Sequence, residues 1–460
     1  MLLRLCVCLL GVAAVWPQAA RRTVSLVITG GTVVTMDANG RVLSPGAVAI
    51  DGRDIVAVDA ADAIAARFDG RESIDAAGQV VMPGLINTHT HAPMVLYRGL
   101  ADDLALMEWL EKYMFPAEAR TVTPAFVRSG TRLAALEMIQ SGTTTYADMY
   151  YFEEEIAKVT KEAGLRGVLG QTIIQFPVAD ARTPAEGLTR SEAFIAQFSG
   201  DELIVPAVAP HSMYTLDAAT LRGVRALADR TRAPVLIHLA ETADEIKTSR
   251  ERHNATPVQY LESLGFWGPR TVAAHAVWLT APDMAILARR HVGVAHNPES
   301  NMKLASGAAR VVDLRRAGVT VGLGTDGAAR NNDLDMFESL RLAAFLAKLQ
   351  TSDPRAIPAR AALEMATIDG ARTLGMDREV GSIEAGKRAD VITVSMTAAR
   401  QTPMYDPLSH LVYTTRGDDV RTTIVNGRVL MRDRRVLTMN EGAVLSEARA
   451  LAEKVRAAVR

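Results

Sequence analysis

Residues 82–91 are Met82-Pro83-Gly84-Leu85-Ile86-Asn87-Thr88-His89-Thr90-His91, a short apolar run that leads into two histidines. The run predicts a strand, in which side chains two residues apart point the same way. His89 and His91 can therefore bind one ion from the same side while Thr90 faces away. Two histidines can also simply end a strand, so the choice between metal ligands and structural histidines depends on the rest of the chain.

Between about Pro83 and Gly375, apolar strand-like runs alternate with longer helical patterns, which is typical of βα units in a parallel sheet. Eight such runs end near His91, Asp148, Ile174, His211, His238, His275, His296 and Asp326. Eight units in roughly 290 residues predict a (β/α)8 barrel, which carries its chemistry at the carboxyl ends of the strands. A doubly wound sheet is the alternative, but its usual Gly-x-Gly-x-x-Gly loop is absent after the first strand.

The two ends of the chain share a different sequence pattern, in which short β-branched runs are broken by turn residues such as Gly30-Gly31. This pattern predicts a small β-sandwich to which both ends of the chain contribute. We therefore expect the β-sandwich in residues 23–82 and 376–436, the barrel in 83–375, and an amphipathic closing helix in 437–460.

The first twenty residues resemble a secretory signal peptide, with one positive charge, an apolar run from Leu5 to Trp16 and small residues after it. We expect export to the periplasm or the cell exterior if this segment is cleaved, and a cytoplasmic protein otherwise. Both cysteines, Cys6 and Cys8, fall in the segment, so the remaining chain has no thiolate metal ligand.

The composition is that of a globular enzyme, with 48% hydrophobic and 22% charged residues. A net charge of -1 provides no basic field to attract nucleic acid. The apolar amino-terminal run is too short for a stable membrane anchor. We expect a small-molecule substrate as the partner and a homo-oligomeric assembly.

Six of the nine histidines lie at predicted carboxyl ends of barrel strands: His89, His91, His211, His238, His275 and His296. Any one of them alone could be a structural residue, but scattered core histidines would not gather at one rim. Asp326 adds a carboxylate on the last strand, which lies next to the first in a closed barrel. Three or four nitrogen and oxygen ligands predict a catalytic zinc site. The fourth strand offers no lysine that could bridge a second metal, so we expect one ion.

These motifs together resemble the metal-dependent amidohydrolase superfamily, and within it the branch of the methylthioadenosine and S-adenosylhomocysteine deaminases and the triazine hydrolases. The resemblance covers nearly everything from Val24 to Val436. It rests on residues 83–91, on His238-Leu239-Ala240-Glu241, on Ala274-His275-Ala276 and on Gly324-Thr325-Asp326-Gly327.

The resemblance implies that His89, His91, His238 and Asp326 ligate one Zn²⁺, with Fe²⁺ as the alternative metal, and that Glu241 is the proton shuttle. Zinc lowers the pKa of bound water toward about 7, so hydroxide is available at working pH. Glu241 would carry a proton from the water to a substrate ring nitrogen. His275 would steer the hydroxide and Asp326 would relay a proton to the leaving amine. Zinc deaminases with Pro-Cys-x-x-Cys ligands are excluded, because no cysteine follows Cys8.

Three further positions are implied for substrate binding. Glu118 corresponds to a carboxylate that binds ribose hydroxyls, His211 corresponds to a histidine that contacts the nucleoside, and Trp109 could line the pocket. The arginines that bind the substrate carboxylate in homocysteine-binding members have no clear counterpart here, where Gln171 and Thr183 align best. Arg182 and Arg190 lie nearby and could substitute for them.

We therefore expect a hydrolytic deaminase of an adenine nucleoside: methylthioadenosine, 5'-deoxyadenosine, adenosine or S-adenosylhomocysteine. The alternative is hydrolysis of another aromatic N-heterocycle, such as a guanine, a pterin or an s-triazine. A barrel that is kept only for assembly would be expected to have lost ligands, and none is missing.

Overall fold

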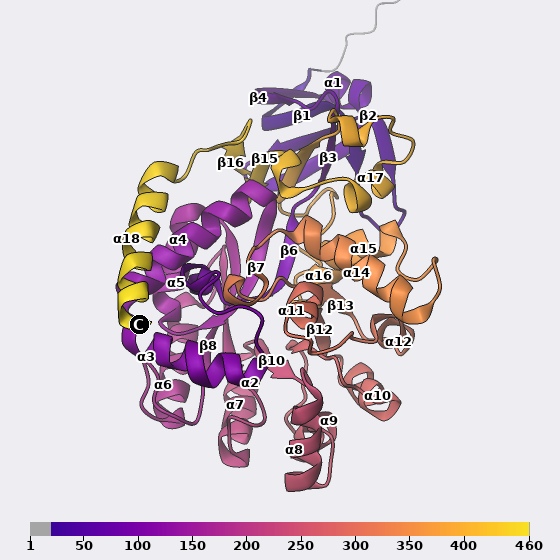
Figure 1. Ribbon diagram of the computed structural model, residues 1–460. Coiled ribbons are helices and arrows are strands. Elements are labelled where there is room, and N and C mark those ends of the chain that lie inside the picture. The colour runs from indigo at the N-terminus through magenta and orange to yellow at the C-terminus, as the bar shows by residue number, and fades with distance from the viewer. Residues whose placement is uncertain (1–19, 460) are drawn as a thin grey trace, which may run out of the picture.

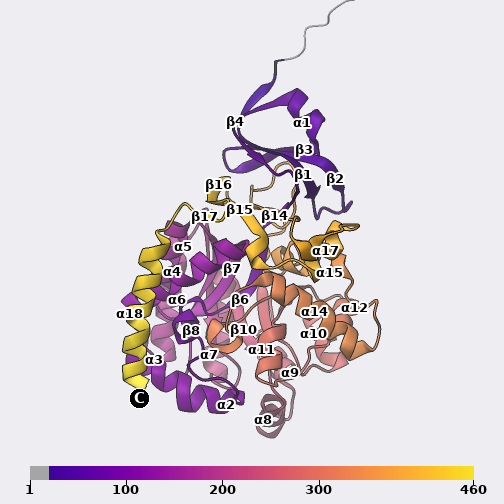
Figure 2. The same ribbon diagram turned by 45° about the horizontal axis from the view of Figure 1, so that its top comes forward.

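The computed structural model describes residues 20–459. A mixed β-sheet forms the upper part of the molecule and a barrel of parallel strands, surrounded by helices, forms the lower part (Figures 1 and 2). Residues 1–19, which carry the predicted signal peptide up to its last residue, lie outside this description. Within residues 20–459, no helix is long and apolar enough to cross a membrane.

The predicted barrel is confirmed. Within the described chain, eight strands hydrogen-bond in sequence order, and each neighbouring pair is parallel. Six of the eight end within one residue of their predicted position, β7 ends two residues after Asp148, and the last ends three residues before Asp326. The strands are β6 (Leu85–Thr90), β7 (Thr143–Tyr150), β8 (Arg166–Ile173), β9 (Ile204–Pro210), β10 (Val235–Leu239), β11 (Thr271–His275), β12 (Gly293–His296) and β13 (Val321–Leu323).

The first and last barrel strands meet at the carboxyl end of β13. The backbone N–H of Asp326 donates to the carbonyl oxygen of His89 at 3.0 Å. The hydroxyl of Thr88 donates to the carbonyl oxygen of Leu323 at 2.9 Å. Gly322 has no room for a side chain, since an added Cβ would lie 2.6 Å from the Thr88 methyl group. These contacts close the barrel and fix Asp326 beside His89.

Helices cover the outside of the barrel, and their amphipathic patterns explain the alternation seen in the sequence. They are α4 (Pro124–Ser141), α5 (Glu153–Ala163), α6 (Pro184–Phe198), α7 (Ala218–Thr231), α8 (Ala243–His253), α9 (Pro257–Ser263), α10 (Ala281–Arg289), α11 (Pro298–Lys303), α12 (Val311–Arg316), α13 (Ala328–Asn331), α14 (Met336–Thr351), α15 (Ala359–Ala366) and α16 (Ile368–Thr373). The closing helix, α18 (Glu441–Val459), packs beside α3 and α4 (Figure 1).

The connection from β6 to α4 is unusually long and helical. It consists of η1 (Ala92–Tyr97), α2 (Leu106–Glu108), η2 (Trp109–Met114) and α3 (Phe115–Thr121). η2 is a single π-helical stretch, a rare form that is frequent at functional sites. This segment is not one of the eight βα units, and it carries Trp109 and Glu118.

Both chain ends contribute to one β-domain, as predicted. Its strands form a single hydrogen-bonded mixed sheet. Residues 22–34 form one continuous strand, so the strand break expected at Gly30-Gly31 is wrong. The chain instead changes register around Gly31 while it keeps pairing with its neighbour, and Gly30 tolerates the required positive φ of 84°.

The sheet strands are β1 (Arg22–Val34), β2 (Val42–Asp51), β3 (Asp54–Ala60), β4 (Phe68–Asp75), β5 (Gln79–Pro83), β14 (Val391–Ser395), β15 (Val420–Val425), β16 (Arg428–Arg432) and β17 (Arg435–Val436). The associated helices are α1 (Ala61–Arg67), η3 (Ala399–Gln401), α17 (Pro407–Tyr413) and η4 (Gly417–Asp419). β14 pairs with β5, so the segment after the barrel completes the sheet begun before it.

The sheet contacts the amino-terminal ends of the barrel strands, away from the histidines. Arg166, the first residue of β8, forms a bidentate ion pair with Asp390, with Nε to Oδ2 at 3.0 Å and Nη2 to Oδ1 at 3.2 Å. Both side chains are 2% exposed. The backbone N–H of Gly84 also donates to the carbonyl oxygen of Asp390 at 3.0 Å. Asp390 therefore joins the two parts of the protein.

Replacing Asp390 with alanine should lower the free energy of unfolding by about 3–5 kcal/mol, because it leaves a buried guanidinium without a counter-charge. Chemical denaturation of the purified variant measures this loss. The exposed ion pair of Arg432 with Glu72 provides a control, and Glu72→Ala should cost less than about 1 kcal/mol. Equally small losses in both variants would contradict the proposed importance of the buried pair.

Candidate active site

Four side chains at the carboxyl end of the barrel point at one another. His91 Nε2 lies 3.3 Å from Asp326 Oδ1, and His89 Nε2 lies 3.5 Å from the same oxygen. His238 Nε2 lies 3.3 Å from His91 Nε2. Two atoms that each lie about 2.0–2.1 Å from a tetrahedral zinc ion are about 3.3–3.4 Å apart. The spacing therefore fits a zinc ion held in common.

The other ring nitrogens of two of these histidines are held by backbone carbonyls. His91 Nδ1 donates to the carbonyl oxygen of Met149 at 2.7 Å, and His238 Nδ1 donates to that of His211 at 2.8 Å. A proton fixed on Nδ1 leaves the Nε2 lone pair free, which is the usual arrangement of a metal-binding histidine. The two rings are thus prepared to bind a metal.

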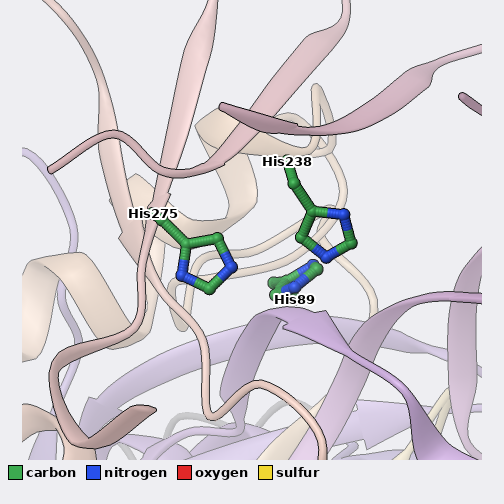
Figure 3. A group of neighbouring side chains, drawn as sticks. All are labelled: His89, His238 and His275. Carbon is green, nitrogen blue, oxygen red and sulfur yellow. The ribbon is translucent and has the colours of Figure 1, made fainter. Parts of the chain in front are cut away.

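Among the buried nitrogens that lack a hydrogen-bond partner within residues 20–459, two lie at this cluster, namely His89 Nε2 and His275 Nε2. Figure 3 shows the rings of His89, His238 and His275 facing a common space. Buried polar atoms without partners are rare and call for an explanation. A bound ion for His89 and a water molecule for His275 would supply the missing partners.

Burial governs the protonation of these groups. It lowers the pKa of His89 and of His238, and it lowers the pKa of His91 to about 3. Burial alone would raise the pKa of Asp326, but Arg330 and His89 together bring it well below its ordinary value. At neutral pH the site therefore holds neutral imidazoles and an ionised carboxylate, which are the protonation states that bind metal.

Glu241 and His275 lie next to the four converging side chains. His275 Nε2 lies 3.6 Å from Glu241 Oε2 and 3.8 Å from Asp326 Oδ2. His275 Nδ1 contacts Asn301 Oδ1 at 2.9 Å, and the Ser300 hydroxyl donates to Asp326 Oδ2 at 2.7 Å. α11 therefore orients both His275 and Asp326.

The backbone at the ends of these strands adopts conformations that side chains usually avoid. His275 has a φ of 73° and Asp326 a φ of 65°, and Ala240 and Ala276 also lie in the left-handed region. Each such residue costs about 1–3 kcal/mol and persists only where the surroundings enforce it. Four such residues therefore lie at the strand ends that carry the site.

Arg330 belongs to the candidate active site, and the sequence reasoning missed it. Its Nη1 donates to Glu241 Oε1 at 2.9 Å and to Asp326 Oδ2 at 3.0 Å. The guanidinium also lies over the ring of Trp109, 5.1 Å from the centroid. Its position four residues after Asp326, on α13, is the only sequence signal that could have indicated it.

A pocket opens beside the cluster at the carboxyl end of the barrel. Its walls include each of the three predicted substrate contacts. The lining residues are His91, Met94, Trp109, Leu110, Met114, Phe115, Glu118, Met149, Tyr150, Tyr151, Thr172, His211, His238 and Arg330. Residues from η2 and α3 thus face the rim histidines across the pocket.

Glu118 is the one carboxylate in this lining. The hydroxyl of Tyr150 donates to its Oε1 at 2.7 Å. Burial raises the pKa of Glu118 to about 7, and the Tyr150 hydrogen bond partly opposes this rise. His211 is also buried, and its Nδ1 lies within 3.3 Å of the hydroxyls of Ser212 and Thr215. Burial lowers the pKa of His211 to about 3, so its ring is neutral.

Other residues considered from the sequence lie elsewhere. His296 is buried at the end of β12, and it belongs to neither of the two groups of candidate metal ligands that contain His89. Arg190 pairs with Glu154 at 2.8 Å and with Asp180 at 3.4 Å. Neither Arg190 nor Arg182 lines the pocket.

The fold and the site define a class: a (β/α)8 barrel with the histidines and aspartate at its carboxyl rim that a metal-dependent hydrolase requires. Comparison with known families identifies it more closely. Residues 80–430 match the amidohydrolase family, and the chain belongs to that family.

Two curated relatives resemble nearly the whole chain. The 5-methylthioadenosine/S-adenosylhomocysteine deaminase of Syntrophobacter fumaroxidans is 46% identical over 94% of this chain and 98% of its own. The 5'-deoxyadenosine deaminase of Methanosarcina acetivorans is 45% identical with the same coverage of both chains.

Among solved structures, a zinc-bound adenosine deaminase from Xanthomonas campestris superimposes with a TM-score of 0.94. It is 39% identical to this chain, and the match covers 95% of this chain and all of the other.

Removing one of the four converging side chains should release the metal. We expect wild-type protein to retain about one Zn²⁺ per chain after dialysis. His238→Ala should bind zinc about 100-fold more weakly or worse, because even residues that merely support a ligand are worth 10–100-fold. Metal analysis of dialysed protein measures the difference.

His296→Ala is the matched control, since His296 is a buried histidine at the same rim that lies outside the cluster. It should retain full zinc content. Zinc loss from the control, or zinc retention by His238→Ala, would contradict the ligand set.

Proposed function

We propose that the protein is a zinc-dependent hydrolytic deaminase of an adenine nucleoside that releases ammonia. The observation that carries the proposal is that Glu118, a carboxylate suited to a vicinal diol, lines the same pocket as His91 and His238. The deaminase names of the relatives support the same assignment. The proposal joins a hydrolytic centre to a ribose-binding group in one cavity.

In this proposal His89, His91, His238 and Asp326 hold one Zn²⁺, and their spacing fits that ion. When bound, zinc is a Lewis acid that brings the pKa of water toward about 7. Asp326 supplies its Oδ1 to this set, while its Oδ2 accepts hydrogen bonds from Ser300 and Arg330. The two oxygens of one carboxylate thus have separate partners.

Glu241 moves the first proton. Its Oε1 is held by Arg330, and its Oε2 faces His275. We assign to Oε2 the transfer of a proton from water to a ring nitrogen of the purine, which makes the adjacent ring carbon electrophilic. His275 Nε2, which has no partner among the described residues, accepts a hydrogen bond from the water and so orients it.

Asp326 assists the departure of the amine. As the water oxygen bonds to the ring carbon, the second water proton passes by way of Asp326 to the amino group. The carbon–nitrogen bond then breaks, ammonia leaves, and a ring carbonyl remains. Each proton lost by water is thereby accounted for, one on the ring and one on ammonia.

Three residues would recognise the nucleoside. A Glu118 carboxylate can accept a hydrogen bond from each of two adjacent ribose hydroxyls. His211, which is neutral, can donate to or accept from the base, and Trp109 offers an apolar wall. These roles are assigned from the positions of the side chains around the pocket.

The remaining pocket wall indicates which adenine nucleosides fit. It is largely apolar, with Met94, Leu110, Met114, Phe115 and Met149. Apart from histidine, Arg330 is the single basic residue in the lining, and it is already paired with two carboxylates. A substrate carboxylate would lack the charge-assisted partner worth roughly 1.5–3 kcal/mol. We therefore favour methylthioadenosine, 5'-deoxyadenosine and adenosine over S-adenosylhomocysteine.

Export by a cleaved amino-terminal segment and homo-oligomeric assembly stay predictions from the sequence. Amino-terminal sequencing and light scattering of purified protein would test them. Scavenging of external nucleosides is the role that export would imply.

Zinc-loaded protein should release ammonia from these three nucleosides faster than from guanine, pterins or s-triazines. Glu241→Gln should keep its zinc while kcat falls by several orders of magnitude, because the amide cannot take a proton from water. A coupled ammonia assay with metal analysis measures both. Full activity of Glu241→Gln would refute the mechanism, and preferred turnover of a triazine would refute the substrate class.

The KM for nucleosides should fall as pH rises from 6 to 8. Below its pKa of about 7 Glu118 is protonated and loses acceptor strength, whereas above it the carboxylate binds both ribose hydroxyls. In the protonated range KM should change up to about tenfold per pH unit. Steady-state kinetics across this range measure the effect.

Glu118→Gln should raise the KM at pH 8 about tenfold, in keeping with one charge-assisted hydrogen bond, and should make KM independent of pH. A 2',3'-dideoxynucleoside should show neither effect with either protein. A Glu118 variant with unchanged nucleoside KM would remove the ribose argument.

A further inference from the structure

Arg330 lines the pocket but is neither a proposed metal ligand nor a proposed substrate contact. It lies on α13 and reaches back over the carboxyl end of the barrel, where it is 4% exposed. A buried guanidinium is stable only if it is paired and hydrogen-bonded. Both carboxylates that pair with it belong to the proposed reaction, namely Glu241 and Asp326.

A single nitrogen makes both contacts. Nη1 donates to one oxygen of each carboxylate, at 2.9 Å and 3.0 Å. The two bonded oxygens are Glu241 Oε1 and Asp326 Oδ2. The Oε2 atom of Glu241 remains directed at His275 Nε2, 3.6 Å away. Arg330 thus selects which oxygen of Glu241 faces the reacting centre.

The same guanidinium touches the segment that covers the pocket. It lies 5.1 Å from the ring centroid of Trp109, and a cation over an indole ring is an attractive contact. Trp109 begins η2, which leads directly into the helix that carries Glu118. Arg330 therefore contacts the barrel carboxylates on one side and the covering segment on the other.

We propose that Arg330 is a positioning residue for the proposed reaction, which holds Glu241 and Asp326 in the orientation needed for proton transfer. The inference rests on the proposed function. Glutamate has three rotatable side-chain bonds, and without Nη1 its carboxylate could turn away from His275. Loss of this orientation should slow the chemical step more than it weakens substrate binding.

The test compares three variants with wild-type protein by steady-state ammonia release. Arg330→Met should lower kcat by about 100-fold and change KM less than threefold, with zinc content retained. Arg330→Lys should recover part of kcat, because an ammonium can still donate to both carboxylates. Arg190→Met is the control: it removes a partly buried, ion-paired arginine that lies outside the pocket lining, and it should keep kcat.

Chemical rescue separates orientation from folding. In Arg330→Ala, added guanidinium chloride at tens of millimolar should raise kcat with saturation, whereas equal sodium chloride should not. A variant that had lost activity through general destabilisation would lose still more in guanidinium. Rescue therefore supports a local role for the missing group.

Three outcomes would overturn the proposal: an Arg330→Met kcat within threefold of wild type, a loss confined to KM, which would make Arg330 a substrate contact, or absence of guanidinium rescue. Failure of the proposed function would look different. Wild-type protein itself would then release no ammonia from any nucleoside tested.

Discussion

The closure of the barrel is the constraint on which the site depends. β6 and β13 are the first and last strands, and the hydrogen bond from the Asp326 amide to the His89 carbonyl joins their ends. Residues 237 positions apart in the sequence thereby place a carboxylate and an imidazole 3.5 Å from one another. Any loss of closure would separate the aspartate from the histidine pair, and no single element could replace the arrangement.

Around this junction, the charged and titratable groups are buried. The histidines are held neutral by burial, and Asp326 keeps its charge because Arg330 and neighbouring hydrogen-bond donors surround it. Because a low-dielectric site strengthens every electrostatic contact, each donor has a large effect on its acceptor. The same surroundings enforce the left-handed backbone conformations of His275 and Asp326.

The two other parts of the protein support the barrel from opposite ends. The mixed sheet contacts the amino-terminal ends of the strands through the buried pair of Arg166 and Asp390. The covering segment, from η1 to α3, contacts the carboxyl-terminal rim through Trp109 and Glu118. The two ends of the chain thus support the base of the barrel, whereas the segment between β6 and α4 forms the recognition surface.

The sequence by itself determined the barrel, because eight apolar runs separated by helical patterns leave few other ways to bury those runs. It also indicated the metal site, since alternation in a strand places His89 and His91 on one face and the strand ends collect the remaining ligands. Local patterns of this kind depend only on near neighbours, which the sequence displays directly.

Only the tertiary structure decided how the carboxylates are oriented and what lies opposite them. The ion pairs of Arg330 with Glu241 and of Arg166 with Asp390 join residues 89 and 224 positions apart. Nothing in either local sequence specifies these contacts. The course of β1 across Gly30-Gly31 is similar, because pairing with β2 outweighs the local preference of glycine for a turn. Such features depend on how distant segments meet, which a pattern along the chain does not contain.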